Sequence, residues 1–316
     1  MKRILVVGSL NMDIVIETPC MPKAGETIAG KSIAQIPGGK GANQAFAAGK
    51  LGGNIAMMGA VGNDEKGEKL LESLKGVGVD ISRIEVMNDI PTGQAFITVD
   101  DQGENAIIII AGANGKVTKE LIDSNLALIK QSDIIIMQLE IPLEIVGYVK
   151  KIVEEDGKIV ILDPAPAIKD IPENILKGID YIKPNETELQ ILTGMEVKNR
   201  KDITEAAKIL IKKGVKNVIV TMGGDGCLYI NKDIEEFFPA YPVKAIDTTA
   251  AGDCFTAAFA LALSQNKNWK EAIEFGQKAS SIAVTRKGAQ TSIPTREEVD
   301  EMKGGKMKGG KGKNYY

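Results

Sequence analysis

The 316-residue sequence contains no histidine. Without an imidazole there can be no Ser-His-Asp or Cys-His catalytic set and no His-ligated zinc. A general base must therefore be Asp, Glu, Lys, Tyr or Cys. The three cysteines, Cys20, Cys227 and Cys254, form no C-x-x-C pair. This spacing argues against a disulfide framework or structural zinc, and it fits a reducing cytoplasm.

Charge and long apolar runs are also scarce. The formal net charge is only −3 and aromatic residues make up 4% of the chain, so neither a basic surface nor a stacking platform for nucleic acid is predicted. The apolar run Ile4–Leu10 is short and is followed by Asn11 and Asp13, unlike a signal peptide. No stretch reaches the length of a membrane span. We expect a soluble protein that binds neither nucleic acid nor membrane.

What the sequence does contain is a series of short apolar runs separated by helical patterns. Ile203, Ala207, Leu210 and Ile211 have the spacing of one helix face. Continuous apolar strands alternating with amphipathic helices predict an α/β fold, a doubly wound and mostly parallel sheet with helices on both faces and ligands at the carboxyl ends of the strands. The predicted strands are Ile4–Val7, Ile55–Met58, Ile134–Met137, Ile159–Leu162, Ile179–Ile182 and Val218–Thr221.

Two stretches, Thr27–Ile36 and Gln94–Ile110, are rich in β-branched residues and read as strand–turn–strand units without helices. They indicate a small β-sheet lid from segments of about 12–36 and 90–111, inserted in a single α/β core of residues 1–302. An ordinary edge hairpin explains the pattern equally well. The Lys- and Gly-rich tail, 303–316, is predicted to be disordered.

Two common phosphate-binding motifs are absent from the sequence. There is no G-x-x-x-x-G-K-[ST] loop and no strand-associated G-x-G-x-x-G, which disfavours a dinucleotide oxidoreductase. Asp247-Thr-Thr-Ala-Ala-Gly-Asp-Cys-Phe255 instead leads into a strong helical stretch, whose N-terminus could bind an anion between its backbone N–H groups. Asp253 would stand beside that anion. It could equally be an ordinary acidic residue of a first helical turn.

The motifs together resemble a known family. Asp247-Thr-Thr-Ala-Ala-Gly-Asp253 is similar to the D-T-x-[GA]-A-G-D signature of the ribokinase-like sugar kinases, the PfkB carbohydrate kinase family. Gly38-Gly-Lys-Gly-Ala-Asn-Gln44 resembles its sugar-binding segment. Further matches, in family order, are Gly8-Ser-Leu-Asn-Met-Asp13, Gln138-Leu-Glu140, Asp163-Pro-Ala-Pro-Ala167, Pro184-Asn-Glu-Thr-Glu188 and Thr285-Arg-Lys-Gly-Ala-Gln290.

The resemblance implies an ATP-dependent kinase with an alcohol acceptor, which phosphorylates the 5-hydroxyl of D-ribose to ribose 5-phosphate. Asp253 would be the general base, and backbone N–H groups of Ala250, Ala251 and Gly252 would form the anion hole. Taken singly, each polar residue at a strand end is more often a cap or turn residue. The sugar-binding residues implied are Asn11 and Asp13, which are expected at the end of the first strand, and Gly39, Lys40, Asn43, Glu140 and Asp253.

On the nucleotide side, the resemblance implies that Asn185 and Glu188 orient the waters of Mg²⁺ and the phosphates of ATP. The same N-x-x-E pair could simply cap a helix, and a glycine-rich hairpin would look like the loop that follows the strand ending at Thr221. The nucleotide-binding residues implied are Asn185, Glu188, Thr221, Met222, Gly223, Gly224, Asp225, Gly226, Gly252 and Gln277.

The resemblance also implies a K⁺ site and a homodimer formed through the lid. The K⁺ site would use Asp247, Thr249, Ala283, Arg286, Gly288 and Ser292. Many relatives have Gly at the position of Ala250, and we expect a negative φ there. Cys254 is predicted to be a packing residue.

Three rivals to ribose phosphorylation remain. The nearest is another kinase of the family, acting on deoxyribose, fructose, a keto-deoxy acid or a nucleoside, because one polar change in a pocket redirects specificity. A sugar-binding regulator without catalysis should lack the base, whereas this chain keeps Asp253. The dinucleotide oxidoreductase lacks its fingerprint.

Overall fold

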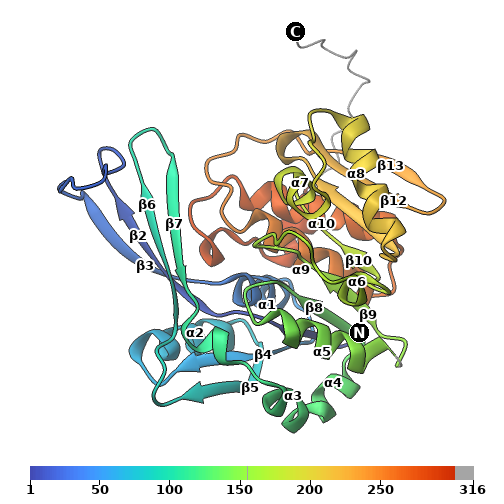
Figure 1. Cartoon of the computed structure of the whole chain (residues 1–316), viewed down its shortest axis with the longest axis horizontal. Helices are drawn as coiled ribbons and strands as arrows, with labels where there is room; N and C mark the ends of the chain where they lie inside the picture. The colour runs from blue at the N-terminus through green and yellow to red at the C-terminus, as the bar shows by residue number, and fades with distance from the viewer. Residues whose placement is uncertain (155, 303–316) are drawn as a thin grey trace.

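The computed structural model describes residues 1–154 and 156–302, and the tail predicted to be disordered, 303–316, lies outside these residues. A nine-stranded sheet runs through the molecule in the order β13-β12-β11-β10-β9-β8-β1-β4-β5 (Figure 1). Its neighbours are parallel from β5 to β11, and the β11–β12–β13 edge is antiparallel. Its strands are β1 (Ile4–Val7), β4 (Ile55–Gly62), β5 (Asp80–Met87), β8 (Ile134–Met137), β9 (Ile159–Leu162), β10 (Tyr181–Ile182), β11 (Asn217–Thr221), β12 (Gly226–Asn231) and β13 (Glu235–Pro239).

The helices cover both faces of this sheet. The bounds are α1 (Lys40–Lys50), α2 (Glu65–Gly76), α3 (Lys119–Ser124), α4 (Leu126–Gln131), α5 (Leu143–Glu154), α6 (Glu173–Leu176), α7 (Glu186–Thr193), α8 (Arg200–Lys212), α9 (Ala251–Ser264), α10 (Trp269–Ala283) and α11 (Arg296–Glu301). Three short 3₁₀ turns lie at Gly112–Lys116, Gly223–Asp225 and Gln290–Ser292. The predicted doubly wound α/β class is confirmed.

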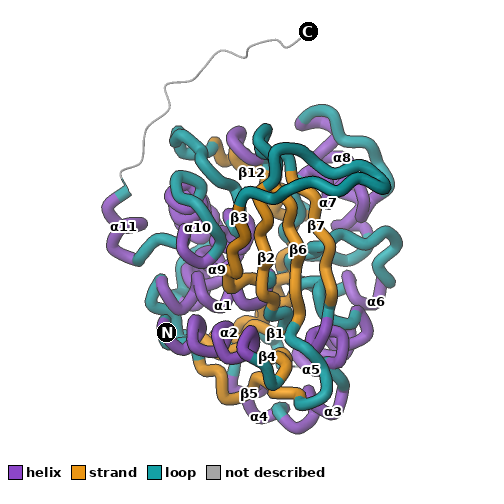
Figure 2. Tube along the Cα trace, turned by 90° about the vertical axis from the view of Figure 1, so that its left-hand side faces the viewer, coloured by secondary structure: helices purple, strands orange, loops and turns teal. Residues whose placement is uncertain are grey.

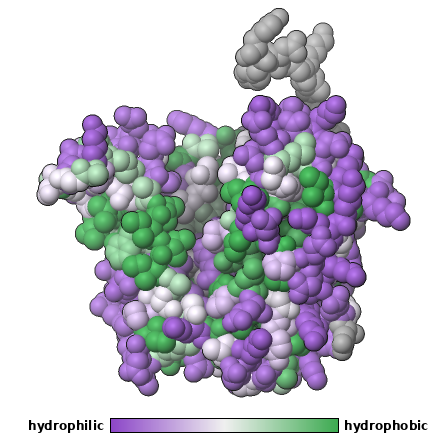
Figure 3. All heavy atoms as spheres, viewed as in Figure 1, coloured by the Kyte–Doolittle hydropathy of each residue, from purple (hydrophilic) through white to green (hydrophobic). Residues whose placement is uncertain are grey.

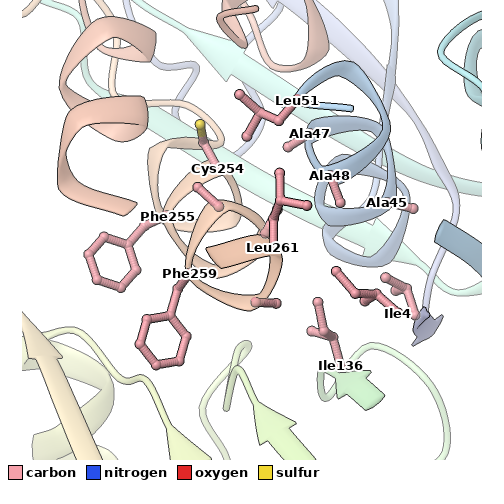
Figure 4. Close-up of a cluster of buried hydrophobic side chains, with 14 of the residues drawn as sticks. Ile4, Ala45, Ala47, Ala48, Leu51, Ile136, Cys254, Phe255, Phe259 and Leu261 are labelled. Atoms are coloured by element: carbon pink, nitrogen blue, oxygen red, sulfur yellow. The ribbon is translucent and has the colours of Figure 1, made fainter. Parts of the chain in front are cut away.

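The core is divided in two by the sheet, because successive residues of a strand point to opposite faces. Ile4 and Val6 of β1 pack with α1, α2, α9, α10 and α11, whereas Leu5 and Val7 pack with α3 to α8. Figure 4 shows the first layer, where the alanines of α1 lie against Leu261 of α9 and near Ile4. Small residues allow α1 and α9 to approach closely, and both helices carry candidate site residues at their N-termini.

A second sheet of four strands stands apart from the core, and we refer to it as the lid sheet. Its order is β3-β2-β6-β7, with β2 (Asn11–Glu17), β3 (Ser32–Gly38), β6 (Gly93–Val99) and β7 (Asn105–Ile110) side by side in Figure 2. The predicted small β-sheet is therefore present. Polar turn residues close the β6–β7 hairpin, where Oδ1 of Asp100 accepts the N–H groups of Gln102 and Glu104.

Two details of the prediction are wrong. Thr27–Ile36 does not form a strand–turn–strand unit, because it contributes to β3 alone, and β3 pairs with β2 instead. Asn11 and Asp13 do not end the first strand. The first strand ends before Gly8, and no strand is present at residues 8–10. Asn11 and Asp13 belong to the next strand, β2. They therefore stand at the base of the lid sheet, close to the carboxyl end of β1.

None of the helices within the described residues is both long and apolar enough to cross a membrane.

Candidate active site

Helix α9 begins at the signature segment with an unusual turn. Ala250, its N-cap, has φ 57° and ψ 9°, in the left-handed region. The expected negative φ is therefore wrong: the turn that joins Thr249 to the helix demands this conformation of whichever residue stands there. A non-glycine residue in this region costs about 1–2 kcal/mol, so the turn holds backbone strain beside the site.

The first turn of α9 presents unpaired donors. The N–H of Ala251 donates to the carbonyl of Thr248 at 3.2 Å. The N–H groups of Gly252 and Asp253 have no partner among the described residues, and no side chain caps the helix. Donors at the positive end of a helix dipole are suited to bind an anion, and we refer to this turn as the candidate anion site.

Asp253 lies in this first turn and is buried, with 6% exposure. Its Oδ2 accepts from Nδ2 of Asn43 and its Oδ1 from Nε2 of Gln44, both at 3.0 Å. Burial raises the pKa of Asp253 to about 6, since it outweighs the attraction of Lys40 and is reinforced by the carboxylate of Asp163. A carboxylate whose pKa is raised toward neutral pH, and which accepts hydrogen bonds from two amides, is suited to act as a general base.

Gln44 was not singled out in the sequence, yet it joins three parts of the site. Besides Asp253, its Nε2 donates to Oδ2 of Asp163 at 2.9 Å. Its Oε1 accepts from Nε2 of Gln138 at 2.6 Å. The amide thus separates two buried carboxylates, and all its polar atoms are engaged.

The candidate sugar-binding residues form a second cluster around Glu140. Oε2 of Glu140 accepts from the backbone N–H of Lys40 at 3.1 Å, from Nδ2 of Asn11 at 3.5 Å and from the hydroxyl of Ser9. Burial, together with the charges of Glu140 and Asp253, raises the pKa of Asp13 to about 7. These carboxylates therefore share one region of negative potential.

Glycine and asparagine keep the cluster compact. Gly39 precedes α1 with φ 86°, and a Cβ there would lie 2.6 Å from the backbone nitrogen of Asn11. Asn114, another residue that the sequence did not reveal, donates from Nδ2 to Oδ1 of Asn11 at 2.8 Å and fixes the orientation of that amide. Its contacts lie more than 100 positions away in the chain, so no local pattern could have exposed it.

A cleft of about 560 Å³ opens on the other side of Asp253. Lys40 joins the two halves, because its side chain lines the cleft while its backbone contacts Glu140. Burial lowers the pKa of Lys40, but Asp253, Asp163 and Glu140 together reverse that effect, so the ammonium stays charged. Predicted residues that line the cleft are Asn185, Glu188, Thr221, Gly223, Gly224, Gly226, Ala250, Ala251, Gly252, Asp253 and Gln277.

Asn185 and Glu188 have both of the roles that the sequence allowed. They form a capping box at the start of α7, with two reciprocal bonds of 2.8 Å. They also line the cleft, and Oε1 of Glu188 accepts no hydrogen bond from the described residues. That oxygen could contact a water of Mg²⁺, although residues 1–154 and 156–302 contain no ready-made cluster of three acidic or cysteine ligands.

Three predicted nucleotide residues are placed differently from the rest. Met222 and Asp225 do not line the cleft, since their backbones close the turn into β12. Gln277 lines it, but its Nε2 donates to the carbonyl of Phe238 at 2.9 Å. Its remaining acceptor could still face a ligand.

The predicted K⁺ residues are only partly brought together. Asp247 accepts from the N–H and hydroxyl of Thr249, at 2.9 and 2.6 Å, and from the N–H of Gly288 at 2.8 Å. Burial alone would raise the pKa of Asp247, but these hydrogen bonds outweigh burial and lower the pKa below its ordinary value. Two of the other three contact each other, since the backbone N–H of Arg286 donates to the carbonyl of Ala283, while the guanidinium of Arg286 pairs with Glu298. The hydroxyl of Ser292 donates to the carbonyl of Ala289.

The geometry combines a buried carboxylate, a helix N-terminus whose first N–H groups are unpaired within the described residues, and a large cleft. Comparison with known proteins identifies the family. Residues 1–296 match the pfkB family of carbohydrate kinases. The chain belongs to this family. Its members include a protein named ribokinase from Haemophilus influenzae, 42% identical over 95% of this chain and 98% of that protein.

The relatives of this chain include proteins named for different sugars. A protein named deoxyribokinase from Salmonella typhi is 38% identical, over 94% of this chain and 97% of that one. The solved structure of the Arabidopsis thaliana ribokinase complexed with ribose and ATP superimposes with a TM-score of 0.90 at 38% identity, covering 95% and 98% of the two chains.

Proposed function

We propose that this chain transfers the γ-phosphoryl group of ATP to the 5-hydroxyl of D-ribose, giving ribose 5-phosphate. The observation that carries the proposal is the position of Asp253, which lines the cleft and also bonds the sugar-side residue Asn43. Relatives named ribokinase at about 40% identity support it.

In the reaction, the 5-oxygen of ribose attacks the γ-phosphorus in line and its proton passes to Asp253. One O–P bond forms while the bond between the γ-phosphorus and the bridging oxygen of ADP breaks. The free N–H groups of Gly252 and Asp253 would stabilise the equatorial oxygens of the transferred group. Asn185 and Glu188 would hold Mg²⁺ through its waters, and the ion would neutralise phosphate charge.

The lid sheet would close over the sugar and exclude water, because its base carries Asn11 and Asp13.

We also propose that the lid sheet pairs with the lid sheet of a second copy of the chain. β7 is an edge strand in which Ile107, Ile108, Ile109 and Ile110 are all exposed, and β3 adds Ile33. Figure 3 shows this hydrophobic surface over the lid strands. Such an edge, with no charged side chain in β7, favours pairing with its own copy. Sedimentation of wild type and Ile108→Lys tests it, with dissociation of a dimer expected.

Two further parts of the proposal concern K⁺ and location. The K⁺ site would lie just before α9, where the carboxylate of Asp247 accepts from Thr249 and from the N–H of Gly288, and a carboxylate with neighbouring backbone carbonyls suits a weakly hydrated cation. A cytoplasmic location fits the supply of ATP and the free thiols of Cys20, Cys227 and Cys254.

A panel of sugars tests the function. Purified protein with Mg-ATP should phosphorylate ribose with the highest kcat/KM of the panel. It should not phosphorylate the product again. Deoxyribose is the competitor to include, because a deoxyribokinase is among the relatives. A preference for deoxyribose, fructose or a nucleoside would replace the ribose assignment, and no turnover with any sugar would contradict the kinase itself.

A further inference from the structure

Lys183 is a buried cation at the carboxyl edge of the sheet, directly after β10. Its backbone N–H donates to the carbonyl of Leu162 at 3.0 Å, and only 5% of the residue is exposed. Its Nζ lies 3.3 Å from Oδ2 of Asp163, whose side chain is equally buried. The residue also lines the cleft.

The ammonium lies over the anion site. A Cβ built on Gly252 would be 3.3 Å from Nζ of Lys183, so this cation faces the first turn of α9. The unpaired N–H groups of Gly252 and Asp253 belong to that same turn. Two kinds of donor for an anion, one charged and one from the backbone, therefore converge at one point of the cleft.

Lys183 has donors to spare. An ammonium carries three N–H groups, and within the described residues its Nζ makes the ion pair with Asp163 and no other polar contact. Oδ2 of Asp163 already accepts from Gln44 at 2.9 Å and from Thr256 at 3.3 Å. Because the residue lines the cleft, an anion bound there could accept from the unused donors.

We propose that Lys183 contacts the γ-phosphoryl oxygens of ATP during transfer, while Asp163 acts as a positioning residue that directs the ammonium. The inference rests on the proposed kinase function and adds a named cation to the backbone donors. Lys183 takes no part in the proton transfer. Its charge offsets the negative charge of the phosphoryl group as the group moves toward the sugar oxygen.

The competing explanation is that Lys183 only neutralises the buried Asp163. A counter-ion of that kind would affect folding but would not distinguish ATP from ADP. A contact with the γ-phosphoryl group would distinguish them, because ADP lacks that group.

The test compares the Kd values of Mg-ATP and Mg-ADP, without sugar, in wild type and Lys183→Met. We expect ATP to bind about 10- to 100-fold more weakly and ADP to stay within about threefold, since one charge-assisted hydrogen bond is lost for ATP alone. With ribose present, kcat should fall by about 10²-fold or more. Lys150→Met is the matched control, because Lys150 is also 5% exposed and ion-paired, with Glu154, but lies on α5 away from the cleft.

A double variant, Asp163→Asn with Lys183→Met, removes both buried charges and keeps the comparison valid if Lys183→Met folds poorly. Under the proposal it regains thermal stability, but ATP still binds no more tightly than in Lys183→Met. Equal weakening of ATP and ADP, no weakening of either, or recovery of ATP binding in the double variant would overturn the inference. Because nucleotide binding is measured without sugar, wild type that binds ATP but phosphorylates no sugar would sink the proposed function alone.

Discussion

The amide nitrogen of Gln44 lies 3.0 Å from Oδ1 of Asp253, a contact that spans 209 positions of the chain. The same nitrogen holds Asp163, so a single neutral group separates two buried carboxylates that would otherwise repel each other directly. The contact stabilises the ionised form of Asp253 and keeps the pKa of the base from rising higher.

Replacing Gln44 by Met should therefore raise the pKa of Asp253 above about 6. A hydrogen bond to a charged group is worth about 1.5–3 kcal/mol, which corresponds to about 1–2 pH units. The acidic limb of the kcat–pH profile should move upward by that amount, because the base must be ionised to accept a proton. Gln131→Met, at the exposed end of α4, serves as a control. An unmoved limb in a folded variant would contradict the role of Gln44.

Asp253→Asn should lower kcat by at least about 10²-fold while ATP binding is largely retained. Asn has nearly the same shape but cannot take up the proton of the sugar hydroxyl. Its amide would also face the donors of Asn43 and Gln44 on one side, so circular dichroism must accompany the kinetics. Retention of more than about a third of the wild-type kcat would rule out Asp253 as the base.

Asp13→Asn should separate binding from stability. Losing a charged acceptor for sugar hydroxyls should reduce kcat/KM for ribose about 10- to 150-fold, with the KM of ATP unchanged.

The same variant tests the burial of Asp13. Because the folded-state pKa of Asp13 is about 7 and its ordinary value is 3.8, its contribution favours the folded state at low pH and is lost as pH rises through 7. The variant should therefore gain Tm relative to wild type at pH 8 but not at pH 4. A gain that is the same at both pH values would refute the burial argument.

Ala250 offers a test of the strained turn. Ala250→Gly removes a left-handed alanine but adds freedom to the unfolded chain, so the net change should lie between zero and a gain of about 1 kcal/mol. Ala250→Val should instead lose about 2 kcal/mol, because a β-branched residue tolerates positive φ poorly. Thermal unfolding of the three proteins measures both effects. Equal stability of the Val and Gly variants would be inconsistent with φ 57°.

Activity should rise when K⁺ replaces a bulky organic cation at constant ionic strength and saturating Mg²⁺. Asp247 and Thr249 lie just before α9, and Gly288 bonds Asp247 from a separate segment, so a bound ion would order the anion site. Asp247→Asn should abolish the response to K⁺ while retaining the activity seen in the organic salt. Equal rates of wild type in both salts would argue against the site.

The sequence predicted much of this arrangement because the family motifs identify residues in order along the chain. Asp253, Asn43, Lys40 and Glu140 do lie together. The position of a motif does not determine backbone angles, however, which is why the negative φ expected at Ala250 was wrong. The predicted first strand, Ile4–Val7, is β1, but Asn11 and Asp13, expected at its end, belong to the next strand, β2.

What the sequence could not reveal are contacts between distant polar residues. Gln44, Asn114 and Lys183 are defined as site residues by partners brought close only when the sheet assembles. Lys183 follows a two-residue strand, and Asp163, with which it forms its ion pair, lies in another segment of the chain, so the local sequence does not mark Lys183 as a ligand-binding group. Burial, which gives these residues their significance, is a property of the folded molecule.

The parallel pairing of β2 with β6 sets the order in which the molecule can be built. These two strands are adjacent in the lid sheet, yet β3, α1, β4, α2 and β5 lie between them in the chain. A parallel contact of such long range can form only after the intervening segment has compacted. On a ribosome, the chain must emerge as far as β6, Gly93–Val99, before β2 can meet β6, and until then β2 has only β3 beside it. The sugar-side half of the site is completed later still, because Asn114 and Glu140 follow β6 in the chain.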